Sequence, residues 1–263
     1  TFSTTSQNLY MPPSTKLQRR FKSQYPLQNI FRRCEKDFLD EIISDTPALD
    51  GGETRAMFFS GQLTNICGAY KMKKNTIMYY VRAVQEWIRH RGCPEGFIGD
   101  CHPDYKSDGW YGMLRDYCLS WWQSEPYMKH QQGGERRWQT IQRMVNTTMD
   151  WSGADPRFWF YCLALMCFFN NVCAHQPSNT ASSPGCINMP SVIVPPITKA
   201  YGEKPDISAL LCFHFNQEVY YISDPDTKHF PSKSKESKGW WVGISEHCGH
   251  QMTWKVVDAV TFK

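Results

Sequence analysis

The sequence predicts an α/β core built on a mixed sheet, followed by a small β-barrel. Its 263 residues can bury a full core, as one large domain or two modest ones. Short apolar and aromatic runs come first, and longer runs with helical periodicity follow them. The order of three strands, a helix, a strand, a helix, a strand and then long helices favours a sheet that starts antiparallel and continues with α/β units.

Turn residues separate the predicted elements of the core. Asp50-Gly51-Gly52 lies between the first two strands, and Gly92-Cys93-Pro94 ends the first helix. The predicted strands are 38–45, 54–60, 65–71, 96–100 and 118–123, and the helices between them are 75–90 and 111–117.

The first of the two longer helices begins near Glu135 and is amphipathic. Its apolar face is made by residues spaced three and four apart, namely Trp138, Ile141, Val145 and Met149. A second, polar face carries Glu135, Gln139, Gln142, Arg143 and Asn146. An acidic residue in the first turn suits the helix dipole, so Glu135 by itself is ordinary helix design.

The next helix is predicted at 157–175 and contains the longest apolar run, Phe158 to Phe169. Twelve residues are too few to cross a bilayer, so we expect a buried helix and no membrane partner.

Composition divides the chain into four segments. They are a basic N-terminal arm (1–35), the α/β core (36–176), a linker with a short helix near 197–201 (177–206) and the small barrel (207–263). The barrel is predicted from strand-like runs at 210–215, 218–222, 240–245 and 252–257. The chain starts at Thr1 without an initiator Met, so we expect a piece of a longer protein.

Charge and cysteine content limit the possible partners only loosely. The net charge of +4 permits a polyanionic partner without requiring one. The basic arm, which contains aromatic residues, could lie on nucleic acid, although such a segment is also typical of a solvated linker. Eleven scattered cysteines without a signal peptide favour a reducing compartment. The cluster His247-Cys248-Gly249-His250 lacks the second ligand pair of a zinc site.

Three acidic residues occupy informative positions. Asp45 ends the first predicted strand, Asp100 ends the fourth, and Glu135 opens a helix. Carboxylates at such places can converge at one edge of a sheet, where they repel one another unless a cation lies between them. Oxygen-only ligands favour Mg²⁺ or Mn²⁺, and two such ions can clamp a phosphoryl transfer. For the first position the rival is Asp40, earlier in the same strand.

Several phrases resemble the integrase of copia-type long-terminal-repeat retrotransposons, in the branch found in diatoms and related protists. They run in the family's order from about residue 14 to the C-terminus: SDTPA (44–48), IGDC (98–101), WQSEPY (122–127), ERRWQT (135–140), KPDIS (204–208) and WVGISEHCG (241–249). The resemblance implies a ribonuclease-H-like core, a mixed five-stranded sheet with flanking helices, followed by a small Src-homology-3-like β-barrel.

The resemblance also implies an activity and a site. Asp45, Asp100 and Glu135 would hold two Mg²⁺ or Mn²⁺ ions. The protein would process the 3′ ends of element DNA and join them to target DNA, as a homo-oligomer cut from a larger polyprotein. The joining step would take place in the nucleus, after a cytoplasmic particle stage. SDTPA favours Asp45 over Asp40, and IGDC favours Asp100 over Asp104 and Asp108 in the following loop.

Contacts with DNA are expected around the third carboxylate. The candidates are Tyr127, Gln132, Arg136, Gln139, Gln142 and Arg143, and the arginines 136, 137 and 143 could instead simply solvate the helix. The lysines at 228, 233, 235 and 238 could bind the DNA backbone through charge alone.

This chain departs from the family's usual pattern at several places. The segment between the last two carboxylates is about one residue shorter than usual, and Gln132 stands where relatives have an Asn-containing turn. Gln139 and Gln142 stand where relatives often carry basic residues. The family's N-terminal His/Cys zinc module is not in this chain. Two other functions stay open: an inactive or domesticated module that only binds DNA or oligomerises, and a nuclease that cuts without joining.

Overall fold

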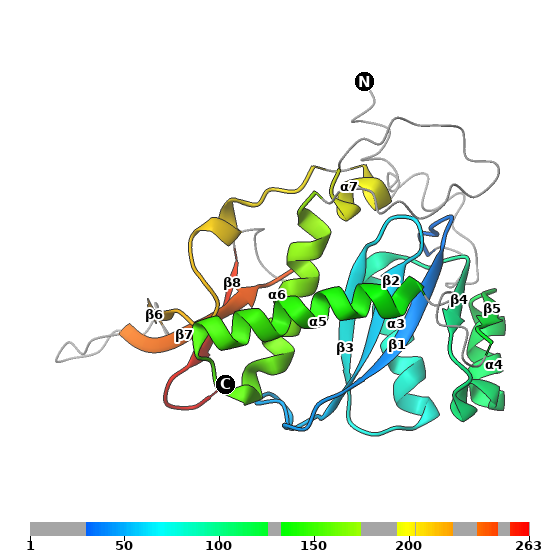
Figure 1. Cartoon of the computed structure of the whole chain (residues 1–263), viewed down its shortest axis with the longest axis horizontal. Coiled ribbons are helices and arrows are strands. Elements are labelled where there is room, and N and C mark those ends of the chain that lie inside the picture. Colours follow the sequence, from blue (N-terminus) through cyan, green and yellow to red (C-terminus); the bar gives the residue numbers. More distant parts are fainter. Residues whose placement is uncertain are drawn as a thin grey trace, which may run out of the picture.

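The computed structural model describes residues 30–125, 133–174, 194–202, 204–222, 236–246 and 253–262. Most of the predicted N-terminal arm, most of the linker, the lysines at 228, 233 and 235 and the cluster His247–His250 lie outside these residues. Figure 1 shows a five-stranded sheet beside a smaller three-stranded sheet, with the long helix α5 extending from one toward the other.

The larger sheet is mixed, and its strand order is β3-β2-β1-β4-β5. β1 pairs antiparallel with β2, as β2 does with β3, whereas β1–β4 and β4–β5 are parallel. The strands are β1 Lys36–Ile43, β2 Arg55–Gly61, β3 Cys67–Met72, β4 Gly96–Gly99 and β5 Ser120–Gln123. The predicted mixed five-stranded sheet is confirmed, and it fits a ribonuclease-H-like core.

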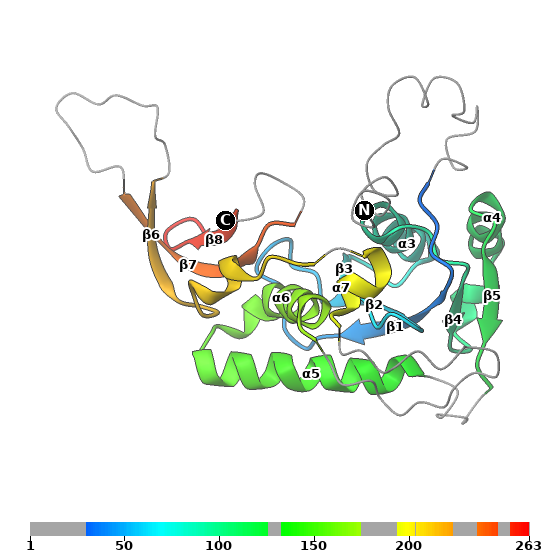
Figure 2. The same cartoon turned by 90° about the horizontal axis from the view of Figure 1, so that it is seen from above.

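Helices cover both faces of this sheet (Figure 2). One face is covered by α3 (Ile77–Arg91) and α4 (Asp108–Asp116), with the short 3-10 helix η2 (Pro103–Lys106) before α4. Its core contains aromatic rings, including Phe59 stacked on Trp87 with centroids 5.1 Å apart. The other face is covered by α5 (Gly133–Ser152) and α6 (Trp159–Val172), with η4 (Pro156–Phe158) between them.

The apolar run that begins at Phe158 forms α6, and the prediction of a buried helix is confirmed. Leu163 and Cys167 are almost fully enclosed, because α6 packs against α5, β3 and the C-terminal sheet. None of the described helices has the length and apolarity needed to cross a membrane. The cysteines that the structure describes are all free thiols.

The C-terminal residues form an antiparallel sheet with the order β6-β7-β8. Its strands are Glu218–Ile222, Glu236–Ile244 and Trp254–Asp258. Trp241 and Val257 are buried in the same cluster as residues of α6, so the two sheets share one core. The predicted Src-homology-3-like barrel stays a prediction, since the described residues form a three-stranded sheet.

Two differences from the sequence prediction concern the C-terminal sheet and the end of the first strand. The strand expected at 210–215 is absent, because the 3-10 helix η5 (Ser208–Leu211) occupies its start and no strand is assigned to the rest. The first strand ends at Ile43 instead of Asp45. Ser44 turns the chain there through its hydroxyl group. This hydroxyl donates to the carbonyl oxygen of Thr46 at 2.9 Å and accepts from the amide of Thr46 at 3.2 Å. The short linker helix is confirmed as α7 (Pro196–Tyr201).

Candidate functional site

Strand register places two carboxylates level with each other on the central strands. β1 and β4 run parallel, with Phe38 paired to Ile98. Two residues further along lie Asp40, within β1, and Asp100, directly after β4. Because side chains alternate along a strand, Asp40 and Asp100 point to the same face as Phe38 and Ile98. The sheet therefore presents two neighbouring carboxylates on the face that α5 covers.

A third carboxylate is brought to this point by the close approach of α5. Gly134 lies so near Phe38 that a Cβ at Gly134 would stand 2.7 Å from the Phe38 Cβ. Glu135 is the next residue, in the first turn of α5. Since Phe38 precedes Asp40 by two residues on the same face of β1, this contact sets Glu135 beside Asp40. Gly133 and Gly134 are the first two residues of this helix.

Arg137 ties the start of α5 to the sheet. Its guanidinium donates hydrogen bonds to the carbonyl oxygens of Gly61 and Gln62, the latter at 2.9 Å. The same group lies 5.4 Å from the centroid of the Phe38 ring. Burial lowers the pKa of Arg137, although Glu35 and other groups oppose this shift. Arg137 was expected either to contact phosphate or to solvate the helix. In the structure its side chain does neither, and it positions α5 on the sheet.

Asp100 and Glu135 act electrostatically on Asp40. Burial raises the pKa of Asp40 to about 6, and the charge of Asp100 is the next largest cause. Glu135 and Glu41 add to the rise, whereas a backbone hydrogen bond from Glu41 opposes it. No cationic side chain is among these main influences on Asp40. A divalent cation bound beside Asp40 would offset this cost of ionising its carboxylate.

The donor set at this place suits a hard divalent cation. Asp40, Asp100 and Glu135 offer carboxylate oxygens only, the ligands that Mg²⁺ and Mn²⁺ prefer. Among the described residues, no three His, Cys, Asp or Glu side chains are gathered closely enough to hold a metal ion. The three carboxylates suit such an ion by their donor atoms and their charge.

Asp45, predicted as the first ligand, does not lie with the other two. Asp40 is the residue of β1 level with Asp100, and Asp45 comes five residues later. At a rise of about 3.3 Å per residue, the extended chain from Asp40 to Ile43 alone spans about 10 Å, and Ser44 then turns the chain. Asp45 is exposed in the loop between β1 and β2, where the Ser44 amide donates to the Thr54 carbonyl at 2.8 Å. The geometry thus favours the rival, Asp40.

Glu41, next to Asp40, points to the opposite face of β1 and has its own partners. Its carboxylate accepts hydrogen bonds from Arg55 at 2.6 Å and from the Tyr80 hydroxyl at 2.9 Å. Burial raises the pKa of Tyr80, and its bond to Glu41 raises it further. These contacts fix the strand on which Asp40 lies and leave Glu41 out of the cluster.

A buried charged network holds the start of the same strand. Asp37 is fully buried and accepts from Arg33 and, at 2.6 Å, from the Trp87 indole. Arg33 also donates to Glu35 at 2.6 Å. Burial raises the pKa of Asp37 to about 6, while the charge of Arg33 opposes the rise. Because its charged groups pair with one another inside the core, this network has a structural role.

The polar face of α5 leads away from the carboxylates. One turn beyond Glu135, the Gln139 amide donates to the Glu135 carboxylate at 3.4 Å. Arg136, Gln139, Gln142 and Arg143 are exposed along the helix, as expected of surface that meets a ligand or solvent. The other two predicted DNA contacts, Tyr127 and Gln132, lie outside the described residues.

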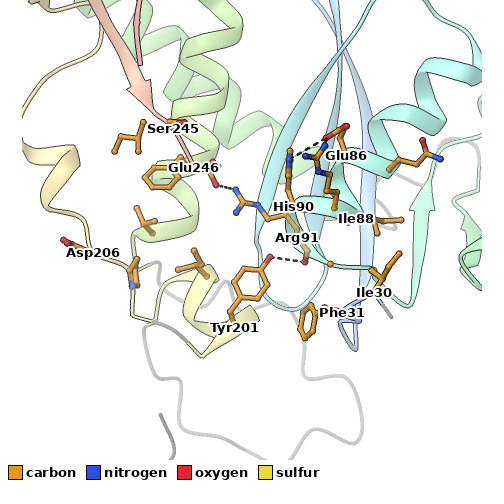
Figure 3. Close-up of a pocket in the computed structure, with 18 of the residues that line it drawn as sticks. Ile30, Phe31, Glu86, Ile88, His90, Arg91, Tyr201, Asp206, Ser245 and Glu246 are labelled. Atoms are coloured by element: carbon orange, nitrogen blue, oxygen red, sulfur yellow. Dashed lines mark hydrogen bonds and ion pairs between the residues drawn. The ribbon is translucent and has the colours of Figure 1, made fainter. Parts of the chain in front are cut away.

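A cavity of about 950 Å³ lies elsewhere, between the end of α3, α7 and the residues after β7. Figure 3 shows the Arg91–Glu246 ion pair in it, and the Tyr201 hydroxyl donating to the Arg91 carbonyl at 3.0 Å. Burial raises the pKa of Tyr201 to about 12, which keeps it a hydrogen-bond donor at neutral pH. None of the predicted catalytic or DNA-binding residues lines this cavity, so we take the carboxylate cluster as the candidate site.

Two comparisons with known sequences give no match: no protein-family model and no curated protein matches the chain. Structural comparison does find similar folds. The HTLV-2 integrase catalytic core domain, in complex with magnesium, is 13% identical, with a TM-score of 0.43, and the match covers 54% of this chain and 90% of that one. A chain of the simian T-cell lymphotropic virus intasome, in complex with the PP2A regulatory subunit B56 gamma, is 12% identical, with a TM-score of 0.49 and coverages of 85% and 77%.

The catalytic core domain of BIV integrase is 10% identical, with a TM-score of 0.45, and the match covers 63% of this chain and 93% of that one. At such scores and identities these likenesses carry no inference about activity.

Proposed function

We propose that this protein is a metal-dependent polynucleotidyl transferase of the integrase type, from a copia-type retrotransposon. It would trim the 3′ ends of the element's DNA and join them to target DNA. The observation that carries the proposal is that Asp40 and Asp100 on a mixed sheet meet Glu135 at the start of the helix that covers it. The copia-like phrases support the same activity, and two of them contain Asp100 and Glu135.

Asp40, Asp100 and Glu135 would hold two Mg²⁺ or Mn²⁺ ions, which when bound stabilise the attacking and leaving oxygens of a phosphodiester. The chain's own groups orient these ligands. Gly134 lets Glu135 approach β1, and Gln139 donates to its carboxylate. In the metal-free state three carboxylates would repel a DNA phosphate, so DNA binding at this point depends on the cation.

The chemistry needs no covalent enzyme intermediate. In the first step the oxygen of water forms a bond to phosphorus and the bond to the 3′ oxygen of the element breaks, which leaves a 3′ hydroxyl. In the second step that hydroxyl attacks a phosphodiester of the target, so one bond forms for each that breaks. We expect target choice to depend mainly on the DNA backbone, since backbone contacts carry no direct sequence information.

The exposed polar face of α5 supports a path for DNA beyond the carboxylates. Arg136, Gln139, Gln142 and Arg143 are the proposed contacts there, together with Tyr127 and Gln132. We also propose that the protein acts as a homo-oligomer, that it is released from a larger polyprotein, and that joining takes place in the nucleus after a cytoplasmic particle stage.

The decisive test is an end-joining assay with purified protein, Mn²⁺ or Mg²⁺, oligonucleotides from the element's termini and a plasmid target. Joined products are expected from the wild type, and none from Asp40→Asn or Asp100→Asn at unchanged secondary structure. A wild-type protein that binds DNA but neither cuts nor joins it with any divalent metal would instead be a DNA-binding module. Cutting without joining would indicate a nuclease.

A further inference from the structure

Two adjacent tryptophans on β5 point to opposite faces of the sheet. Trp121 packs into the core beside α4, with its ring centroid 5.0 Å from that of Tyr105 and 5.2 Å from that of Trp110. A Cβ at Gly99 would stand 2.5 Å from the Trp121 ring, so the two share this face. Since successive side chains alternate, Trp122 lies on the other face, which carries Asp40 and Asp100.

Register places Trp122 next to the carboxylates. Trp122 is paired with Ile98 in the parallel β4–β5 ladder, and Asp100 follows Ile98 by two residues. Neighbouring strands lie about 4.8 Å apart and two residues of strand rise about 6.6 Å, so such diagonal neighbours are about 8 Å apart, within reach of a large aromatic side chain. β5 is the last strand in the sheet order, so no further described strand covers its outer edge.

Packing does not account for this side chain. Trp122 is 41% exposed, whereas Trp87, Trp110 and Trp241 are buried in the two cores. Its ring makes no ring–ring or cation–π contact with another side chain in the part of the chain that the structure describes. A large, flat, uncharged surface thus lies beside a group of anionic side chains.

We propose that Trp122 is a stacking platform for an unpaired base of the DNA strand whose phosphodiester is held at the carboxylates. This inference rests on the proposed function. The carboxylates and their cations can hold the phosphate, while a neutral base is the part of a nucleotide that suits an exposed indole. Base–aromatic stacking tolerates every base, so Trp122 would hold an unpaired end without reading its sequence.

The test is a binding measurement that is independent of catalysis. The DNA is a duplex with an unpaired 2-aminopurine near a 3′ terminus that lacks the 3′ hydroxyl, so joining is impossible, and Mn²⁺ is present. Stacking on the indole should quench 2-aminopurine fluorescence. We expect Trp122→Leu, which keeps apolar bulk on the strand, to abolish the quenching and to weaken binding of the unpaired end about tenfold, equivalent to about 1.4 kcal/mol.

Two variants serve as controls. Trp122→Phe keeps a flat ring and should retain most of the quenching and affinity. Trp151→Ala removes a tryptophan that is 71% exposed but lies at the far end of α5, and should change neither. A fully paired blunt duplex should bind Trp122→Leu and wild type equally. If Trp122→Leu bound and quenched the unpaired end as the wild type does, the inference would be overturned.

Failure of the inference and failure of the proposed function give different results. Normal end joining by Trp122→Leu, with unchanged quenching, removes the platform and leaves the transferase. Absence of joining by the wild type, with quenching that depends on Trp122, removes the transferase and leaves a DNA-binding surface. Should Trp122→Leu lose its thermal transition, Trp122→Thr replaces it, because threonine is favoured in strands. Loss of quenching in Trp122→Thr supports the platform, and retained quenching overturns it.

Discussion

Replacing Asp40 by Asn should make the metal-free protein more stable while abolishing its response to metal. The pKa of Asp40 is raised from its usual 3.8 to about 6 by burial and by Asp100, Glu135 and Glu41. Folding therefore disfavours the ionised form. This cost is absent below the pKa of Asp40 in the unfolded chain, which is about 4. It grows as the pH rises to about 6, the pKa in the folded protein, and is fully present above that value.

The size of this effect follows from the shift. About two pKa units correspond to at most about 3 kcal/mol, and solvent near this partly exposed side chain reduces the gain to about 1–3 kcal/mol. For a chain of this size, each 1 kcal/mol moves the unfolding temperature by about 2–4 °C. At pH 8 without metal, Asp40→Asn should unfold several degrees above the wild type, and at pH 4 the difference should largely vanish.

The assay is thermal unfolding at both pH values, with and without Mn²⁺, alongside end joining. Mn²⁺ should stabilise the wild type but not Asp40→Asn, which should also be inactive. Asp45→Asn is the matched control, because Asp45 is exposed in the loop after β1. The reasoning would be refuted if Asp45→Asn lost the Mn²⁺ response and the activity while Asp40→Asn kept both.

Three further variants test how the site is held in place. Gly134→Ala should lower the free energy of unfolding in chemical denaturation by about 1–3 kcal/mol and weaken the Mn²⁺ response, because the new Cβ would stand 2.7 Å from that of Phe38. Gly112→Ala in α4 is the control. A Cβ there meets no atom within 4 Å, so this change should be neutral or stabilise by up to about 1 kcal/mol. Arg137→Met should cost about 1–3 kcal/mol of stability, because it removes the hydrogen bonds to the carbonyl groups of Gly61 and Gln62. Arg136 is exposed, so Arg136→Met should leave stability unchanged but reduce the slope of log affinity for DNA against log salt concentration by about one. The opposite pattern would reverse the roles of the two arginines. Trp241→Ala should cost about 3–5 kcal/mol and lower a single unfolding transition of the whole chain; two separate transitions would contradict the shared core.

The sequence by itself determined the architecture of the core to a useful extent. The order of strands and helices predicted a mixed sheet because turn residues and apolar periodicity are local signals. The apolar face of the helix after Glu135 was also readable, since Ile141 is buried and Trp138, Val145 and Met149 pack against the same core. The apolar pattern at 210–215 was a weaker signal. A 3-10 helix, Ser208–Leu211, takes the place of the start of the predicted strand.

The predicted first ligand shows why a local signal is insufficient for the site. A strand ending at Asp45 and a strand ending at Ile43 look alike in sequence, and the phrase SDTPA favoured Asp45. Asp40 offered one local clue, since it alternates with Phe38 and Ile42 on one face of β1. Without the register of β1 on β4, nothing in the chain related that face to Asp100.

What only the tertiary structure decided is which residues meet. The parallel pairing of β1 with β4 sets Asp40 level with Asp100, because register fixes positions that lie 60 residues apart in sequence. The approach of Gly134 to Phe38 then brings Glu135 to the same point, because a glycine is the one residue that can come so close. Composition and periodicity supply the elements, whereas contacts between elements, which depend on packing, assemble the carboxylates into a site.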